Sequence, residues 1–271
     1  MTAMNTSRTN QPSVERPEIT GEATRAALLD RAIRSTVPLR RVFVQRPPGS
    51  DPRHGPLKDF VANGDQRGAR AYLITVAANS QQNSDGWTTE LDSLVWARLF
   101  DAHLYTDTDQ GARTAAWRTL QRLKERKLVE LTRARGSRKI SVTLLREDAS
   151  EDPYTRPGVA NKDAYLRLPV AFWKKGLDGQ VGLPGLAMLL AVAAEKPWHA
   201  FPAERMEDWY GWSPDTTLRG LKKLLALGLV ERREVFKSAP LTPTGSTSFY
   251  QYRLVRWMRP KAQARPDASA A

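Results

Sequence analysis

The sequence contains no cysteine among its 271 residues. This absence excludes disulfide bonds, thiolate nucleophiles and cysteine-ligated zinc sites, and it fits a reducing compartment. The three histidines, His54, His103 and His199, lack the paired spacing of metal ligands. The sequence motifs of phosphate-binding loops, dinucleotide-binding turns and nucleophile elbows are also missing. We therefore expect a protein that is not an enzyme and that has no cofactor and no metal.

Long apolar runs are missing as well. The longest, GLAMLLAVAA at 185–194, is far shorter than the roughly 20 residues that cross a bilayer. The first twenty residues are polar and lack the apolar segment of a secretory signal. The sequence therefore predicts a cytoplasmic protein with no membrane partner.

Acidic residues are scarce relative to basic ones. Lys and Arg number 42 against 29 Asp and Glu, which gives a net charge of +13 and an isoelectric point near 10.2. Such an excess attracts polyanions, of which nucleic acid is the commonest in a cytoplasm. The arginine-rich composition of a GC-rich genome produces the same excess, so the charge indicates a class of partner and locates no site.

An internal repeat organises the chain. YLITVAANS at 72–80 matches LLAVAAEK at 189–196, with Val76 falling on Val192. Further along, WRTLQRLKERKLVELTR matches TLRGLKKLLALGLVERR, with Arg118 falling on Arg219. The sequence therefore predicts two units of the same architecture.

Each unit has the pattern strand, helix, helix, helix, strand, strand. In the first unit the expected elements are a strand at 39–47, helices at 69–80, 91–100 and 113–127, and strands at 128–133 and 140–145. In the second they are a strand at 163–169, helices at 186–196, from Pro202 and at 213–227, and strands at 229–236 and 248–257. A helix-turn-helix followed by a hairpin is typical of a winged helix.

The predicted fold class is therefore mainly α with small β-hairpins (α+β), built as two tandem winged-helix domains. The domains are expected at 37–148 and 149–258, with their boundary in the Asp-, Glu- and Pro-rich segment 146–158. A mostly disordered arm, 1–36, with one short helix at 22–35, and a disordered basic tail, 259–271, are expected to flank them. The acidic cluster at 147–152 is interpreted as a solvated linker.

The third helix of each unit is the expected DNA-reading helix, because a helix of this kind enters the major groove. Ser213 is a plausible N-cap, Pro214 takes the first helical position, and Asp215 favours the positive end of the helix dipole. An alternative is that the basic residues are ordinary solvated charges on amphipathic helices. Their recurrence on both third helices favours DNA contact.

The hairpin of the first unit, TRARGSRK, places several cations around Gly136, which suits insertion into a minor groove. A soluble hairpin tip is the alternative. The second hairpin contains Pro240 and Pro243 and only Lys237 near its start, so the first hairpin is favoured. The predicted DNA-binding residues are Arg113, Arg118, Gln121, Arg122, Arg133, Arg135, Arg138, Lys139, Ser213, Thr216, Arg219, Lys222 and Lys223.

Three stretches carry a resemblance: LLREDASEDPYTRPG at 144–158, WYGWSPDTTLRGLKKL at 209–224 and APLTPTGSTSFYQYRL at 239–254. In these the chain resembles an uncharacterised family of tandem winged-helix proteins of high-GC Gram-positive bacteria, over residues 37–256. The resemblance implies the architecture and no particular activity. The long segment LFDAHLYTDTDQGAR at 99–113 departs from the family pattern.

These observations predict a sequence-specific double-stranded DNA-binding protein that acts as a transcriptional regulator and is nucleoid-associated. Two linked winged helices place two reading helices in successive major grooves, about 34 Å apart. One alternative is a plasmid or phage replication initiator, to which DAYLRLPVAFWKKG at 163–176 is loosely similar. Another is a protein–protein adaptor, which needs no basic surface. A homodimer or a protein partner is possible under each hypothesis.

Overall fold

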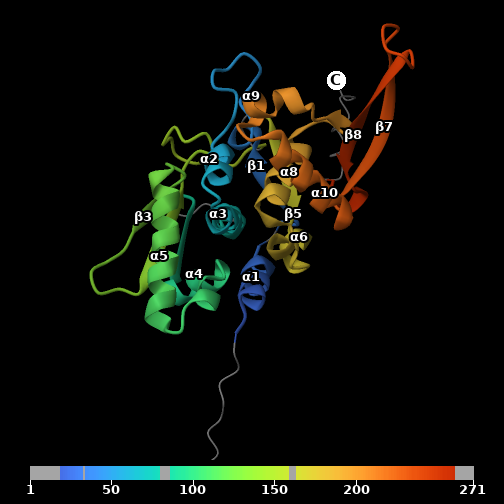
Figure 1. Ribbon diagram of the computed structural model, residues 1–271. Coiled ribbons are helices and arrows are strands. Elements are labelled where there is room, and N and C mark those ends of the chain that lie inside the picture. The colour runs from blue at the N-terminus through green and yellow to red at the C-terminus, as the bar shows by residue number, and fades with distance from the viewer. Residues whose placement is uncertain (1–18, 33, 80–85, 159–162, 260–271) are drawn as a thin grey trace, which may run out of the picture.

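The computed structural model describes residues 19–32, 34–79, 86–158 and 163–259 (Figure 1). Residues 1–18 of the predicted arm and 260–271 of the predicted tail lie outside this range. The described part of the arm contains helix α1 (Gly21–Asp30). Thr20 caps this helix, because its hydroxyl accepts a hydrogen bond of 3.1 Å from the Ala23 N–H.

The first half of the chain follows α1. Its elements are β1 (Thr36–Arg40), the 3₁₀ turn η1 (Arg41–Phe43), α2 (Leu57–Ala62), α3 (Gln66–Ala78), β2 (Thr88–Asp92), α4 (Ser93–Leu99), η2 (Ala102–Tyr105), α5 (Asp109–Glu125), β3 (Val129–Thr132) and β4 (Lys139–Leu144). The second half repeats most of this order.

The elements of the second half are β5 (Tyr165–Pro169), α6 (Ala171–Lys174), α7 (Leu177–Gln180), α8 (Gly182–Ala194), β6 (His199–Ala200), η3 (Ala203–Arg205), α9 (Met206–Tyr210), α10 (Pro214–Ala226), β7 (Val230–Ser238), β8 (Ser246–Leu254) and η4 (Arg256–Met258). The protein is thus a mixed α and β structure with small antiparallel sheets, which confirms the α+β class.

The two halves contain sheets of the same topology. One three-stranded sheet has the order β2-β4-β3 and the other β6-β8-β7, and both are antiparallel. One strand of each sheet lies between the first two helices of its repeat. Strand β2 lies between α3 and α4, and β6 lies between α8 and α9. The sequence patterns missed β2 and β6, because β2 has no alternation of apolar residues and β6 has only two residues.

The helix pair α8 and α10 forms the core of the second half. Helix α8 is apolar on nearly all sides, and its residues from Leu183 to Val192 are buried except for the partly exposed Pro184. It packs against α10 at Gly220, where an added Cβ would lie 2.4 Å from the Pro184 carbonyl oxygen. Only glycine allows this close approach of the two helices.

A third sheet joins the halves. Strand β1 pairs antiparallel with β5, so that Leu39 lies opposite Leu166 and Val37 opposite Leu168. All four of these side chains are buried. Strands β1 and β5, which open the two repeat units, therefore complete a single core.

The start of the segment between the halves is packed against this sheet, which corrects the expectation of a solvated linker at Glu147, whereas Glu151 and Asp152 are exposed as expected. Glu147 is 0% exposed, and one of its carboxylate oxygens lies 2.5 Å from the guanidinium of Arg40. Arg40 also donates to Asp163 at 2.8 Å and to Thr155 at 2.7 Å. The sequence could not show this, because the partner of Glu147 lies 107 residues earlier in the chain.

A second cluster of charged residues connects α1 to both halves through ion pairs. Arg25 of α1 donates to Asp101 at 2.8 Å, and Arg70 of α3 bridges Asp101 at 2.7 Å and Asp178 of α7 at 2.8 Å. Asp178 is 3% exposed, so this cluster replaces water around a buried carboxylate.

Within the described ranges, no helix combines the length and apolar character needed to cross a membrane.

Candidate nucleic-acid interface

Helix α5 forms one side of the candidate site in the first half. It begins at Asp109, four residues before the predicted start, because the Thr108 hydroxyl accepts a hydrogen bond of 3.1 Å from the Gly111 N–H. Much of the segment 99–113 therefore forms regular structure, as η2 followed by the first turn of α5. The early start brings Gln110 onto the helix.

A pocket of about 280 Å³ lies between α5 and the hairpin of β3 and β4. It brings together Arg113, Arg133 and Arg138, three of the residues predicted from the sequence. Gly136 lies at the turn of the hairpin with a φ of 76°, a conformation that glycine adopts without strain. Three further lining residues were missed by the sequence patterns: Gln110, Thr114 and Trp117.

Two of the three arginines of this pocket, Arg113 and Arg133, are held in place by their neighbours. Arg113 donates to Asp92 at 2.8 Å and to the Ser93 hydroxyl at 2.6 Å. Arg133 donates through Nε to the Ser137 carbonyl at 2.7 Å, and its guanidinium carbon lies 5.9 Å from the Trp117 ring centroid. These contacts reduce the rotamer freedom that anion binding would otherwise have to remove.

The charge of the pocket is positive. Burial alone would raise the pKa of Asp92, but hydrogen bonds from the Leu94 N–H and Arg113 outweigh it and hold the pKa below its ordinary value. Asp92 is therefore ionised at neutral pH and pairs with Arg113. Among the described residues, no carboxylate forms an ion pair with Arg133 or Arg138. The pocket is suited to an anion such as a phosphate group.

The other predicted residues of the first half lie in different surroundings. Arg118 is exposed on α5, Gln121 is partly exposed on the same helix, and Arg135 is exposed at the hairpin turn. Lys139 is exposed, and its ammonium lies 3.4 Å from Glu90. Arg118 and Arg135 are therefore free to meet a ligand, whereas Lys139 is partly neutralised.

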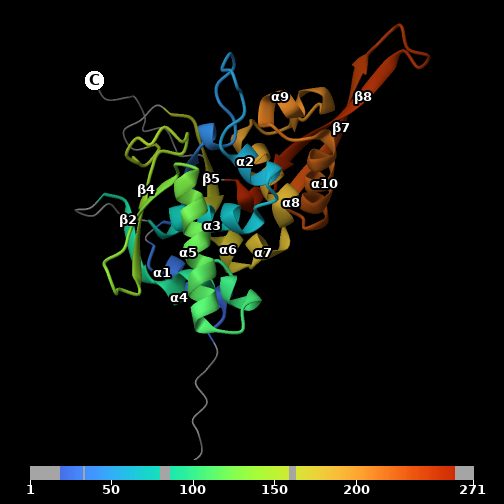
Figure 2. The same ribbon diagram turned by 60° about the vertical axis from the view of Figure 1, so that its left-hand side comes forward.

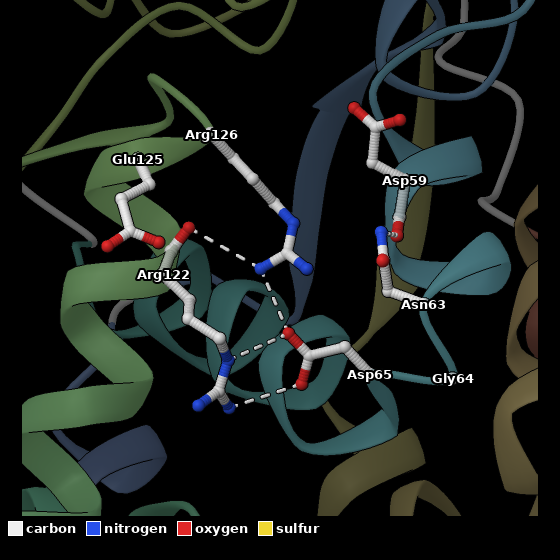
Figure 3. Close-up of a pocket in the computed structure, with 7 residues that line it drawn as sticks. All are labelled: Asp59, Asn63, Gly64, Asp65, Arg122, Glu125 and Arg126. Atoms are coloured by element: carbon white, nitrogen blue, oxygen red, sulfur yellow. Dashed lines mark hydrogen bonds and ion pairs between the residues drawn. The ribbon is translucent and has the colours of Figure 1, made fainter.

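Arg122, which is also predicted to bind DNA, does not line this pocket. Its guanidinium donates to Asp65 at 3.1 and 3.2 Å, and Arg126 lies 2.9 Å from the same carboxylate (Figure 3). These groups line a second pocket of about 610 Å³, together with Asp59, Asn63, Gly64 and Glu125. The acidic side chains there balance the two arginines, so we assign the pocket a structural role.

Asp65 provides a test of this structural role. Burial alone would raise its pKa, but Arg122, the Gly68 N–H and Arg126 outweigh that effect and hold the pKa below its ordinary value. Its contribution to stability is therefore complete above the unfolded pKa and is lost as the pH falls through the folded pKa. We expect Asp65→Asn to lower the free energy of unfolding by about 1–2 kcal/mol at pH 7.

Urea denaturation at pH 7 and at pH 3 measures this effect. The difference between wild type and Asp65→Asn should shrink at the lower pH. Asp59→Asn is the matched control, because the Asp59 side chain is 55% exposed and should change stability little. An equal difference at both pH values would show that Asp65 does not act through its charge.

Helix α10 is the corresponding element of the second half. As predicted, Ser213 caps it, accepting a hydrogen bond of 3.2 Å from the Thr216 N–H, and Pro214 opens it. Thr216 is only 9% exposed, which corrects the prediction that it faces outward. Its hydroxyl lies 3.1 Å from that of Ser213, so it belongs to the cap.

The exposed face of α10 carries Arg219, Lys222 and Lys223. Arg219 lies 2.9 Å from Asp215, one turn earlier, and both side chains are more than 60% exposed. The stem of Lys223 packs near Gly185 of α8. Lys222 is the least constrained of the three cations.

The hairpin of β7 and β8 extends away from the body of the protein (Figures 1 and 2). Its strands have nine residues each and stay paired from Val230 with Leu254 to Ser238 with Ser246. Its outer part exposes Phe236 (70%) and Leu241 (101%). The sequence patterns predicted both strands but missed the full length of this pairing.

No family model, curated protein or solved structure matches the chain. In the part of the chain that the structure describes, no three histidine, aspartate or glutamate side chains gather in a way that could hold a metal ion.

Proposed function

We propose that this protein binds double-stranded DNA in a sequence-specific manner, through two tandem winged helices, and regulates transcription. The observation that carries the proposal is the pocket in which Arg113, Arg133 and Arg138 converge from α5 and the following hairpin. A helix and a hairpin that share a positively charged cleft suit a DNA backbone, since phosphate contacts fix the register of a protein on the duplex. The proposed role is binding without catalysis.

The repeated topology supports the winged-helix assignment. Each half contains the three helices of the repeat (α3, α4 and α5, or α8, α9 and α10), a three-stranded antiparallel sheet, and a hairpin directly after the third of these helices. In a winged helix the third helix enters the major groove and the hairpin contacts the adjacent backbone or minor groove. In this protein those elements are α5 with the β3–β4 hairpin, and α10 with the β7–β8 hairpin.

Arg219 is the residue proposed to read a base. An exposed guanidinium on a reading helix can donate two hydrogen bonds to guanine. In the free protein the Arg219 guanidinium is paired with Asp215 in an exposed and therefore weak ion pair. Lys222 is proposed to contact phosphate, because an ammonium is a point charge without a preferred plane.

We expect Arg219→Ala to remove the preference for one base pair, at a cost of roughly tenfold in affinity for the preferred site. Lys222→Ala should weaken binding to all sequences alike. It should also reduce the slope of log affinity against log salt concentration by about one, because one counterion fewer is released on binding. Fluorescence anisotropy with a preferred duplex and its single-base variants separates the two effects. Equal behaviour of the two variants would remove the assignment of Arg219 to base reading.

Selection of bound fragments from genomic DNA at physiological salt tests the proposed function. A shared motif with two half-sites about 34 Å apart supports two reading helices. Recovery of repeated sites beside a replication origin would assign the protein to replication initiation. Random recovery, with a steep loss of binding as salt rises, would reject sequence-specific binding and favour an adaptor role.

A further inference from the structure

A second basic cavity lies away from both reading helices, where α1, the β1–β5 sheet and the C-terminal turn η4 meet. Its volume is about 820 Å³, within the range of small-molecule sites. Three regions distant in sequence form it, with lining residues within 29–32 and 34–36, within 167–175, and at 257–259. Helices α1 and α6, which flank it, pack against each other (Figure 1).

The walls of the cavity are strongly positive. Five cationic residues line it against one carboxylate, Asp30, which is already paired with Lys174. Within residues 19–32, 34–79, 86–158 and 163–259, no carboxylate lies within ion-pair distance of Arg34, Lys175 or Arg259. The Nε of Arg259 is buried and has no hydrogen-bond acceptor among these residues. A buried donor without an acceptor is costly, and an anionic ligand would supply the acceptor.

The floor of the cavity is apolar and carries one exposed aromatic ring. Leu29, Val170 and Met258 are buried beneath it, and Trp257 is 39% exposed beside it. The ammonium of Lys175 lies 4.3 Å from the centroid of the Trp257 ring. A phosphate that pairs with Lys175 would therefore bring an attached ring next to Trp257, where stacking stabilises it.

We propose that this cavity binds a small organic phosphate with a flat ring, of the chemical class of nucleotides. The combination of unneutralised cations, an apolar floor and an exposed tryptophan suits a ligand that is anionic at one end and aromatic at the other. A duplex backbone offers only the anionic part to such a cavity, since its bases are stacked. The proposal is independent of DNA binding, and it is tested without DNA.

Isothermal titration of the full chain with ATP, tripolyphosphate and adenosine tests the proposal. We expect one ATP per chain, with adenosine and tripolyphosphate each binding at least tenfold more weakly. Trp257→Ala should weaken ATP at least fivefold and leave tripolyphosphate unchanged. The double variant Arg34→Ala/Lys175→Ala should weaken ATP at least tenfold.

The matched control is Lys196→Ala/Arg205→Ala, which removes the same charge from exposed positions outside the cavity and outside the proposed DNA interface. It should leave ATP affinity unchanged. Equal losses in both double variants would show non-specific attraction and overturn the site. Tripolyphosphate binding as tightly as ATP, with no effect of Trp257→Ala, would overturn the requirement for a ring. Circular dichroism of each variant confirms that it is folded.

Discussion

Replacement of Glu147 by alanine is expected to lower the free energy of unfolding by about 3–5 kcal/mol, because it leaves the Arg40 guanidinium buried without its closest counter-charge. Arg40 is 1% exposed, and its remaining carboxylate partner, Asp163, has a side chain that is 33% exposed. Burial raises the pKa of Glu147, while the charge and hydrogen bonds of Arg40 oppose that shift. Urea denaturation followed by tryptophan fluorescence measures the loss.

The matched control for this variant is Glu151→Ala in the same segment. The Glu151 side chain is 52% exposed and pairs with Lys127 at the surface, so its loss should change stability by less than about 0.5 kcal/mol. Glu147→Gln, which keeps an acceptor for Arg40, should fall between the two. A cost below about 1 kcal/mol for Glu147→Ala would show that the Arg40 cluster does not hold the two halves together.

Removal of two arginines from the pocket beside α5 is the second change with a large expected effect. Arg133→Ala/Arg138→Ala should weaken DNA binding by about 100-fold. It should also reduce the slope of log affinity against log salt concentration by about two, because two fewer counterions are released on binding. Arg113 should stay in place in this variant, because Asp92 and Ser93 hold it independently of the hairpin. Titration of a fluorescent duplex at several salt concentrations measures the affinity and the slope.

Arg31→Ala/Lys196→Ala is the control for charge, since both side chains are exposed and lie outside the pocket. It should reduce DNA affinity only slightly. If the two double variants weaken DNA binding equally, the net charge of the protein, rather than the pocket, attracts the duplex. Unchanged binding in Arg133→Ala/Arg138→Ala would place the DNA interface elsewhere.

Features set by neighbouring residues could be predicted from the sequence. The N-cap Ser213, the proline after it and the leucine stripe behind it lie within a few turns of one helix, so α10 was predicted within one residue at each end. The hairpin strands were predicted for the same reason, because alternation is a local pattern. The convergence of Arg113 with Arg133 and Arg138 follows from packing the predicted third helix against the predicted hairpin.

Features set by distant partners could not be predicted. Arg122 looks free in the sequence, yet its partner Asp65 lies 57 residues earlier, in the turn before α3. Glu147 looks solvated in a Pro-rich segment, yet Arg40 buries it. A helical wheel places Thr216 on the exposed face of the helix, but its hydroxyl contacts the hydroxyl of the N-cap residue Ser213. The pairing of β1 with β5 has no signature in either strand alone, since an edge does not specify its partner.

That pairing also sets an order of events during synthesis of the protein. Strand β5 leaves the ribosome about 130 residues after β1, which corresponds to roughly 6–26 s of translation. Through that interval Val37 and Leu39 lack the strand that buries them, and for most of it Arg40 also lacks Glu147, which is made 107 residues after it. The first half of the chain therefore reaches its final packing only once β5, at the start of the second half, has been made.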